Sequence, residues 1–123
     1  MVAFLSDNVL DNGLQYLTDN GLRVDVCSQK PSDYTEATST YTLGNKTNPT
    51  VGSPTNGASN GRRVIVSAIT DGSVTSTGTA THWALSSASE LLATQELTSS
   101  VAVVTGSTFT LDAISVTFPD PTT

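Results

Sequence analysis

The chain has 123 residues, of which 37% are hydrophobic and only 13% are charged, and eleven acidic against five basic side chains give a net charge of −6. This length suits one domain with its own core. The few bases form no basic stripe, so we expect no nucleic-acid partner, and no apolar run approaches the roughly 20 residues that span a bilayer. Ser and Thr supply roughly three residues in ten, well above ordinary usage.

The N-terminal segment predicts a short helix over about residues 4–18, with apolar residues recurring every three to five positions. A helix of about three turns, weakened by Gly13, is marginal in water. Its apolar face therefore needs a surface, either the protein's own sheet or an adjacent subunit. The start also lacks the basic and apolar regions of a signal peptide, so we expect synthesis in a cytoplasm. The helix residues predicted as contacts are Phe4, Leu5, Val9, Leu10 and Leu14.

The middle of the chain predicts less regular structure. Leu22–Ser28 alternates apolar and polar residues as a strand does, a single helical turn is expected over 31–37, and a short extended piece over 39–43. Gly44–Gly61 is dense in Gly, Asn, Ser, Thr and Pro, with Val51 as its only large apolar residue. It is predicted to be a flexible loop, either a contact between subunits or a tolerated insertion.

The remainder reads as a series of short strands, which is typical of a β-sandwich. A turn is expected at Asp71-Gly72, a bulge or bend at Gly78, and a bulge or exposed edge at Asp112. The predicted fold is mainly β, an antiparallel β-sandwich of jelly-roll or immunoglobulin-like type with a short N-terminal helix. The predicted strands are Arg62–Ile69, Val74–Ser86, Val101–Val104 and Phe109–Phe118. Leu91–Leu97 is predicted to be either a further strand or a helical turn.

Residues that carry chemistry are few, and we expect neither a metal nor a cofactor. One Cys and one His do not make the ligand cluster that a metal requires, and Asp7, Asp11 and Asp19 are interpreted as the polar face of the helix. Cys27 lies in an apolar alternation and is interpreted as a buried structural thiol. A nucleophilic cysteine needs a base beside it, and His82 is the only candidate.

Trp83 is predicted to anchor the core. In the run THWAL at 81–85, alternate residues point to opposite faces of a strand, so Trp83 points inward and His82 outward. The alternative is that the two residues form part of a platform for carbohydrate, with Tyr34 or Tyr41 as further aromatic contacts. The glutamates carry no local signature of a glycosidase pair.

Several segments together resemble those of small structural proteins of tailed bacteriophages. They are TATHWAL at 79–85, ELLATQEL at 90–97, VTGSTFTLDAISVTF at 104–118 and the terminal PDP, preceded by LRVDVCSQKP at 22–31 and TEATSTYTLG at 35–44. The resemblance covers most of the chain except Gly44–Gly61. It implies a β-sandwich that lies on, or projects from, the head, neck or tail of the particle, and it carries over no catalytic residue.

From the composition and the resemblance we expect a non-enzymatic virion protein, in the first place a capsid decoration (cement) protein. It would form a homo-oligomer, with a trimer favoured, and bind the major capsid protein or other virion subunits. The expected contacts are the N-terminal helix, the loop at 44–61, and Arg62 and Arg63, for which the plain alternative is an exposed strand start. The other functions considered are a tail, neck or fibre-base protein and a carbohydrate-binding module.

Overall fold

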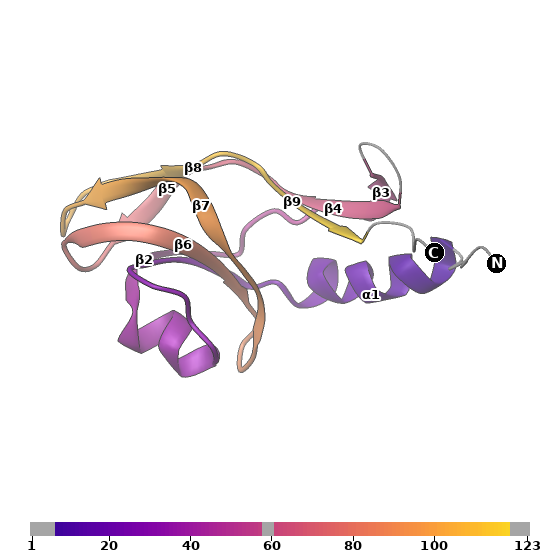
Figure 1. The fold of residues 1–123 in the computed structure, drawn as a ribbon, viewed down its shortest axis with the longest axis horizontal. Helices are drawn as coiled ribbons and strands as arrows, with labels where there is room; N and C mark the ends of the chain where they lie inside the picture. Colours follow the sequence, from indigo (N-terminus) through magenta and orange to yellow (C-terminus); the bar gives the residue numbers. More distant parts are fainter. Residues whose placement is uncertain (1–6, 58–60, 119–123) are drawn as a thin grey trace.

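The computed structural model describes residues 7–57 and 61–118. The predicted fold class is confirmed: the protein is mainly β, its sheets are antiparallel, and one α-helix precedes them (Figure 1). The elements are α1 (Asp7–Asn20), β1 (Arg23–Cys27), a π-helical turn η1 (Glu36–Thr40), β2 (Thr42–Thr47), β3 (Thr55–Asn56), β4 (Arg62–Val66), β5 (Ile69–Val74), β6 (Gly78–Ser86), β7 (Leu91–Val103), β8 (Thr108–Leu111) and β9 (Ile114–Phe118).

Two sheets share one long ribbon of strands. The larger sheet has the order β7-β6-β1-β2-β5-β8, and the smaller has the order β3-β4-β9. Val66 of β4 pairs with Ile114 of β9, and three residues further on Ile69 of β5 pairs with Leu111 of β8. Because the register does not change across this break, β4 and β5 run as one arm beside a second arm made of β9 and β8, and the ribbon passes from one sheet into the other (Figure 1).

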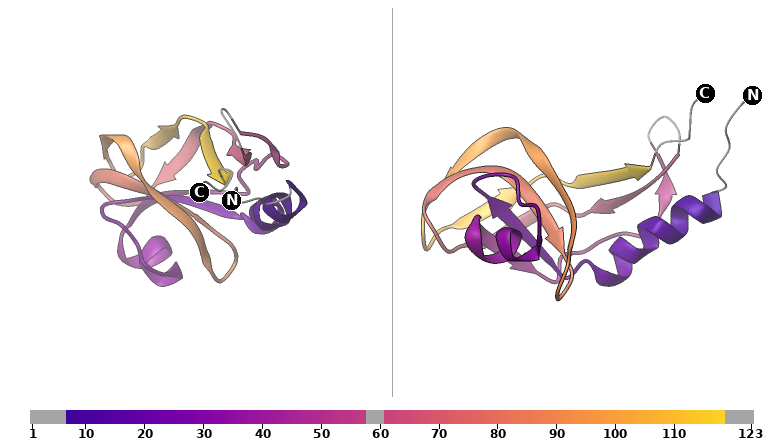
Figure 2. Two further views of the ribbon diagram at one scale, coloured as in Figure 1. Left: turned by 45° about the vertical axis from the view of Figure 1, so that its right-hand side comes forward. Right: turned by 60° about the horizontal axis from the view of Figure 1, so that its bottom comes forward.

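The two ends of the molecule have different architectures. At one end the six-stranded sheet curls round so that its two edges approach each other, which is clearest when the molecule is turned (Figure 2). At the other end α1 packs on β4 and β9. Leu14 and Leu17 of α1 lie in the same apolar cluster as Val64, Val66 and Trp83, so the helix and both sheets share the main core.

The described part of the segment 44–61 joins the sheets at several points, so it is not one continuous loop. Gly44 to Thr47 belong to β2, Val51 forms a bridge with Val66, and Thr55 of β3 pairs with Arg63. A Cβ atom on Gly44 would lie 2.4 Å from the backbone oxygen of Ser73, so the approach of β2 to β5 there requires glycine. Composition did not predict these pairings, because they depend on β1, β4 and β5, which lie elsewhere in the chain. Residues 58–60, at its tip, lie outside the described residues.

Several further boundaries differ from prediction. Strand β4 ends at Val66 and not at Ile69, and β6 begins at Gly78 and not at Val74. Asp71-Gly72 lies inside β5 and is not a turn, because Gly72 pairs with Phe109 of β8. The ring of Phe109 occupies the space where a side chain at Gly72 would project. Residues 91–103 form one strand, β7, and not two. The single strand predicted over Phe109–Phe118 is divided into β8 and β9. Asp112 and Ala113 separate them where the ribbon changes sheet, at the position where a bulge or exposed edge was predicted.

Candidate binding groove

The apolar residues predicted as helix contacts face the protein's own interior where the structure describes them. Leu10 is 4% exposed and Leu14 fully buried. Assigning them to an interface with another subunit was therefore wrong in this fold, since the amphipathic face of α1 covers β4 and β9. Phe4, Leu5 and the side chain of Val9 lie outside the described residues.

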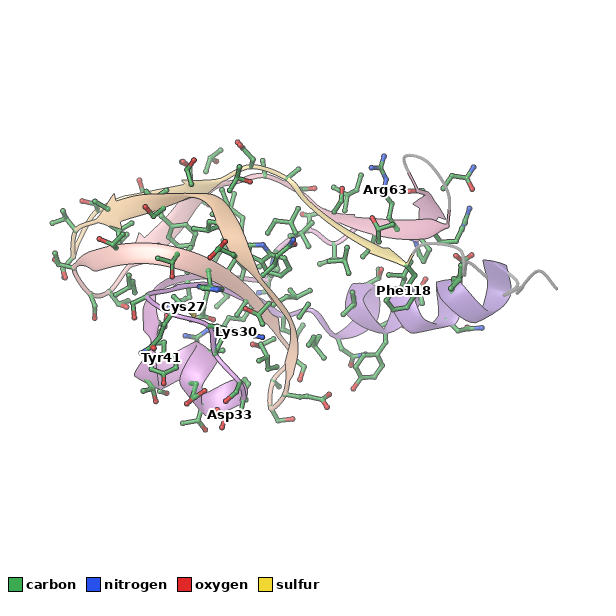
Figure 3. All side chains as sticks on the ribbon, in the orientation of Figure 1. Cys27, Lys30, Asp33, Tyr41, Arg63 and Phe118 are labelled. Atoms are coloured by element: carbon green, nitrogen blue, oxygen red, sulfur yellow. The ribbon has the colours of Figure 1, made fainter. Side chains whose placement is uncertain are left out.

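Arg62 and Arg63, which are adjacent in sequence, have different environments. The guanidinium of Arg62 donates to both carboxylate oxygens of Asp11 on α1, at 2.7 and 3.2 Å, and to Oδ1 of Asn56. Arg62 therefore ties α1 to β4 and is not an open contact for a partner. Arg63 points away from α1 (Figure 3), and its Nε is buried with no hydrogen-bond partner in the part of the chain that the structure describes.

Strand pairing brings Cys27 and His82 together, which the sequence does not reveal. They are directly opposite each other on β1 and β6. However, the Cys27 thiol donates to the carbonyl oxygen of Ala37 (3.6 Å). Burial raises the pKa of this thiol to about 12. It therefore stays protonated at neutral pH, and the pair lacks the activated thiolate of a cysteine nucleophile.

His82 contacts the hydroxyl of the neighbouring Thr81. The Thr81 hydroxyl donates its only proton to the carbonyl oxygen of Ser28 (3.0 Å). His82 Nδ1, 2.9 Å from the same hydroxyl oxygen, must then be the donor in that contact. The contact holds the imidazole against Thr81, its neighbour on β6.

The carboxylate of Asp25, on the same face of β1 as Cys27, is also held by hydrogen bonds. Asp25 is fully buried and accepts from Nε and Nη2 of Arg23, at 2.7 and 2.8 Å, and from the Thr42 hydroxyl at 2.7 Å. Arg23 also donates to the carbonyl oxygen of Thr38, just before η1 ends. This hydrogen-bond network connects β1 to β2 and to η1, so we assign Asp25 a structural role.

An open groove of about 560 Å³ lies where the curled sheet fails to close. One wall is β7 between Gln95 and Val101, and the other runs from Thr110 through Ser115, that is, along β8, the break and β9. In the strand orders, β7 and β8 are the two ends of the larger sheet and β9 is an end of the smaller. Both walls are therefore strand edges that have no neighbouring strand among the described residues.

The groove combines an apolar floor with an acidic rim. Trp83 lines it while remaining only 5% exposed, and the partly buried Leu97 and Ile114 pack against the core beneath it. Glu96 and Asp112 are exposed on opposite walls, and no lining residue is basic. Sequence reasoning did not find this groove, because it exists only through the order of the strands. The one available signal was the expected irregularity at Asp112.

The β7 wall is irregular as well as unpaired. His82 of β6 pairs with Glu96, yet Ala80 pairs with Val101. Residues 97–100 of β7 thus have only Thr81 across from them, and the strand bulges where it borders the groove. Bulges of this kind are common at sheet edges and beside functional sites.

A smaller hollow of about 450 Å³ lies between α1, β7 and β9. Phe118 covers Gly13, where a Cβ atom would lie 2.8 Å from its ring, and the Tyr16 hydroxyl donates to Glu90 at 3.2 Å. This hydrogen bond raises the pKa of Tyr16. Tyr16 and Phe118 are nevertheless 50% and 38% exposed, so this end also presents apolar surface.

Within residues 7–57 and 61–118, no three side chains of His, Cys, Asp or Glu gather closely enough to hold a metal ion. The helices of the same ranges include none with the length and hydropathy of a membrane span. Comparison of the chain with models of protein families, with curated proteins and with solved structures finds no significant match.

Proposed function

We propose that this protein is a non-enzymatic structural subunit of a tailed-bacteriophage particle, and specifically a capsid decoration protein. The observation that carries the proposal is the groove, because its walls are free strand edges and its lining offers no activated nucleophile. An exposed strand edge is a template for pairing with another chain. A protein that keeps one on each side of a groove is suited to assembly. The resemblance of its strand segments to small phage structural proteins supports the same conclusion.

The side chains that could carry chemistry are held in structural roles, which favours assembly over catalysis. The Cys27 thiol is buried and keeps its proton, and the Asp25 carboxylate is closed by Arg23 and Thr42. The hydroxyl-rich, acidic surface suits many weak contacts that are summed over a lattice of subunits. A homo-oligomer, such as a trimer, would bind the particle through several identical subunits at once.

The same features suit a tail, neck or fibre-base subunit, which stays the alternative within this class. A carbohydrate-binding module is less well supported. Such a module presents exposed aromatic faces to the sugar, whereas Trp83 is 5% exposed and neither Tyr34 nor Tyr41 lines the groove.

Quantitative mass spectrometry of purified particles made by the encoding genome tests the proposal. A decoration protein should be present in an amount comparable to that of the major capsid protein. A much smaller copy number, matching the symmetry of the neck or tail, would favour the alternative of a tail, neck or fibre-base subunit. Complete absence from particles, with the protein abundant in the lysate, would refute a virion role.

A further inference from the structure

We propose that the groove between β7 and the β8–β9 wall binds an extended, basic peptide segment, which enters as an additional β-strand. The inference deepens the proposed function by naming the kind of segment that a neighbouring subunit would supply. It rests on the proposed function only for which protein supplies the segment, namely a neighbouring virion subunit.

Backbone pairing is the first part of the argument. Within the described residues, β7, β8 and β9 each have a strand neighbour on one side only. A strand edge presents a row of N–H and C=O groups, and an inserted strand satisfies them with main-chain hydrogen bonds that do not depend on its sequence. The volume of about 560 Å³ lies within the range of ordinary ligand sites.

Side-chain chemistry selects the peptide. Successive residues of a strand point to opposite faces, so one set of side chains would face the apolar floor at Trp83, Leu97 and Ile114. The other set would lie beside the exposed carboxylates of Glu96 and Asp112, which no cation within the groove lining offsets. Charge complementarity therefore favours a segment in which apolar residues alternate with Lys or Arg.

A synthetic peptide of about six residues that alternates Val with Lys has the length of an ordinary strand and serves as the probe. Two matched peptides isolate the two parts of the argument. One alternates Val with Glu. The other keeps Val and Lys but carries N-methyl groups on alternate residues, which remove backbone donors and leave the charge unchanged. Trp83 is the only tryptophan of the chain, so its fluorescence reports occupation of the groove.

We expect saturable binding of the Val-Lys peptide, with slower amide hydrogen exchange along 95–101 and 110–115. Both control peptides should bind at least several-fold more weakly. The double variant Glu96→Gln with Asp112→Asn should weaken binding of the Val-Lys peptide about three- to tenfold at low salt. The matched variant Asp19→Asn, which changes an exposed carboxylate on α1, should leave it unchanged.

Each opposite result overturns a stated part of the proposal. Equal binding of the N-methylated peptide would exclude strand addition, and equal binding of the Val-Glu peptide would exclude selection by charge. Absence of saturable binding by any peptide would reject the site altogether. These outcomes concern the isolated protein, so they are distinguishable from failure of the proposed function, which is decided by the composition of particles.

Discussion

Arg62 of β4 holds Asp11 of α1 through two contacts with the carboxylate, Nε to Oδ1 at 2.7 Å and Nη2 to Oδ2 at 3.2 Å. Both side chains are partly buried, at 18% and 31% exposure. The contact joins residues 51 positions apart in the chain, so it fixes the helix on the sheet. Because α1 also buries Leu14 and Leu17 there, the ion pair and the apolar face act on the same junction.

A double-mutant cycle measures this junction. Arg62→Ala and Asp11→Ala should each destabilise the protein, with a coupling of about 1 kcal/mol because the pair is bidentate and partly buried. Urea unfolding followed by circular dichroism gives the free energies. Arg63→Ala, at the next position of β4, is the control and should be uncoupled to Asp11. If Arg62 and Arg63 were equally coupled to Asp11, the helix would be stabilised by long-range charge attraction and not by this contact.

Trp83 belongs to the main core and should be costly to remove. Trp83→Ala is expected to lower the free energy of unfolding by about 3–5 kcal/mol, through lost apolar contact and the cavity left behind. Trp83→Phe, which keeps an aromatic ring, should cost less. The native emission spectrum gives an independent check, since a buried indole emits at short wavelength. Emission already at the wavelength of the unfolded chain would contradict the core assignment.

Cys27 should be unreactive in the folded protein. Its pKa is raised to about 12, against 9.0 for a free thiol, because burial disfavours the thiolate. The unfolded chain therefore loses this proton first as pH rises, so the stability contributed by the protonated thiol should fall between about pH 9.0 and about 12. Reaction with a thiol reagent at neutral pH should proceed only as fast as unfolding. Rapid labelling of the native protein, with Cys27→Ser as the blank, would show that the thiol is open to solvent.

Gly44 tests whether the segment 44–61 is a strand partner or a loop. Gly44→Ala places a Cβ atom 2.4 Å from the Ser73 oxygen, so it should destabilise the protein by about 1–3 kcal/mol. Gly52→Ala is the matched control, because its nearest neighbour, the Ile65 oxygen, lies at an ordinary 3.4 Å. Hydrogen exchange should also show protected amides over Thr42–Thr47. If both alanine variants were neutral and these amides exchanged freely, the segment would be the flexible loop that its composition predicts.

Local patterns predicted the type of most elements. The helical spacing at the N-terminus and the alternation in Leu22–Ser28 correspond to α1 and β1, and THWAL lies in β6 with Trp83 inward. These patterns were informative because each is decided by burial of side chains on one face. Leu22 is an exception, since it is 45% exposed just before β1 begins.

Features that depend on partners far along the chain were not predictable. Asp71-Gly72 has the composition of a turn, but it lies in β5, which pairs with β8 from far along the chain. The sequence predicted Arg62 as a contact residue or an exposed strand start. Its ion pair with Asp11 was not predictable, because it forms only when α1 packs on β4. The groove likewise depends on β7 and β8 becoming the two ends of a curled sheet, which is a property of strand order and not of any local segment.

Cryo-electron microscopy of native particles made by the encoding genome tests the central claim, that this protein is a decoration subunit, most directly. The account predicts density for the curled sheet and for α1 at repeated positions over the capsid lattice. An extended segment of a neighbouring subunit should lie in the groove beside Trp83. A capsid surface without this density, in particles that lack the protein altogether, would contradict it.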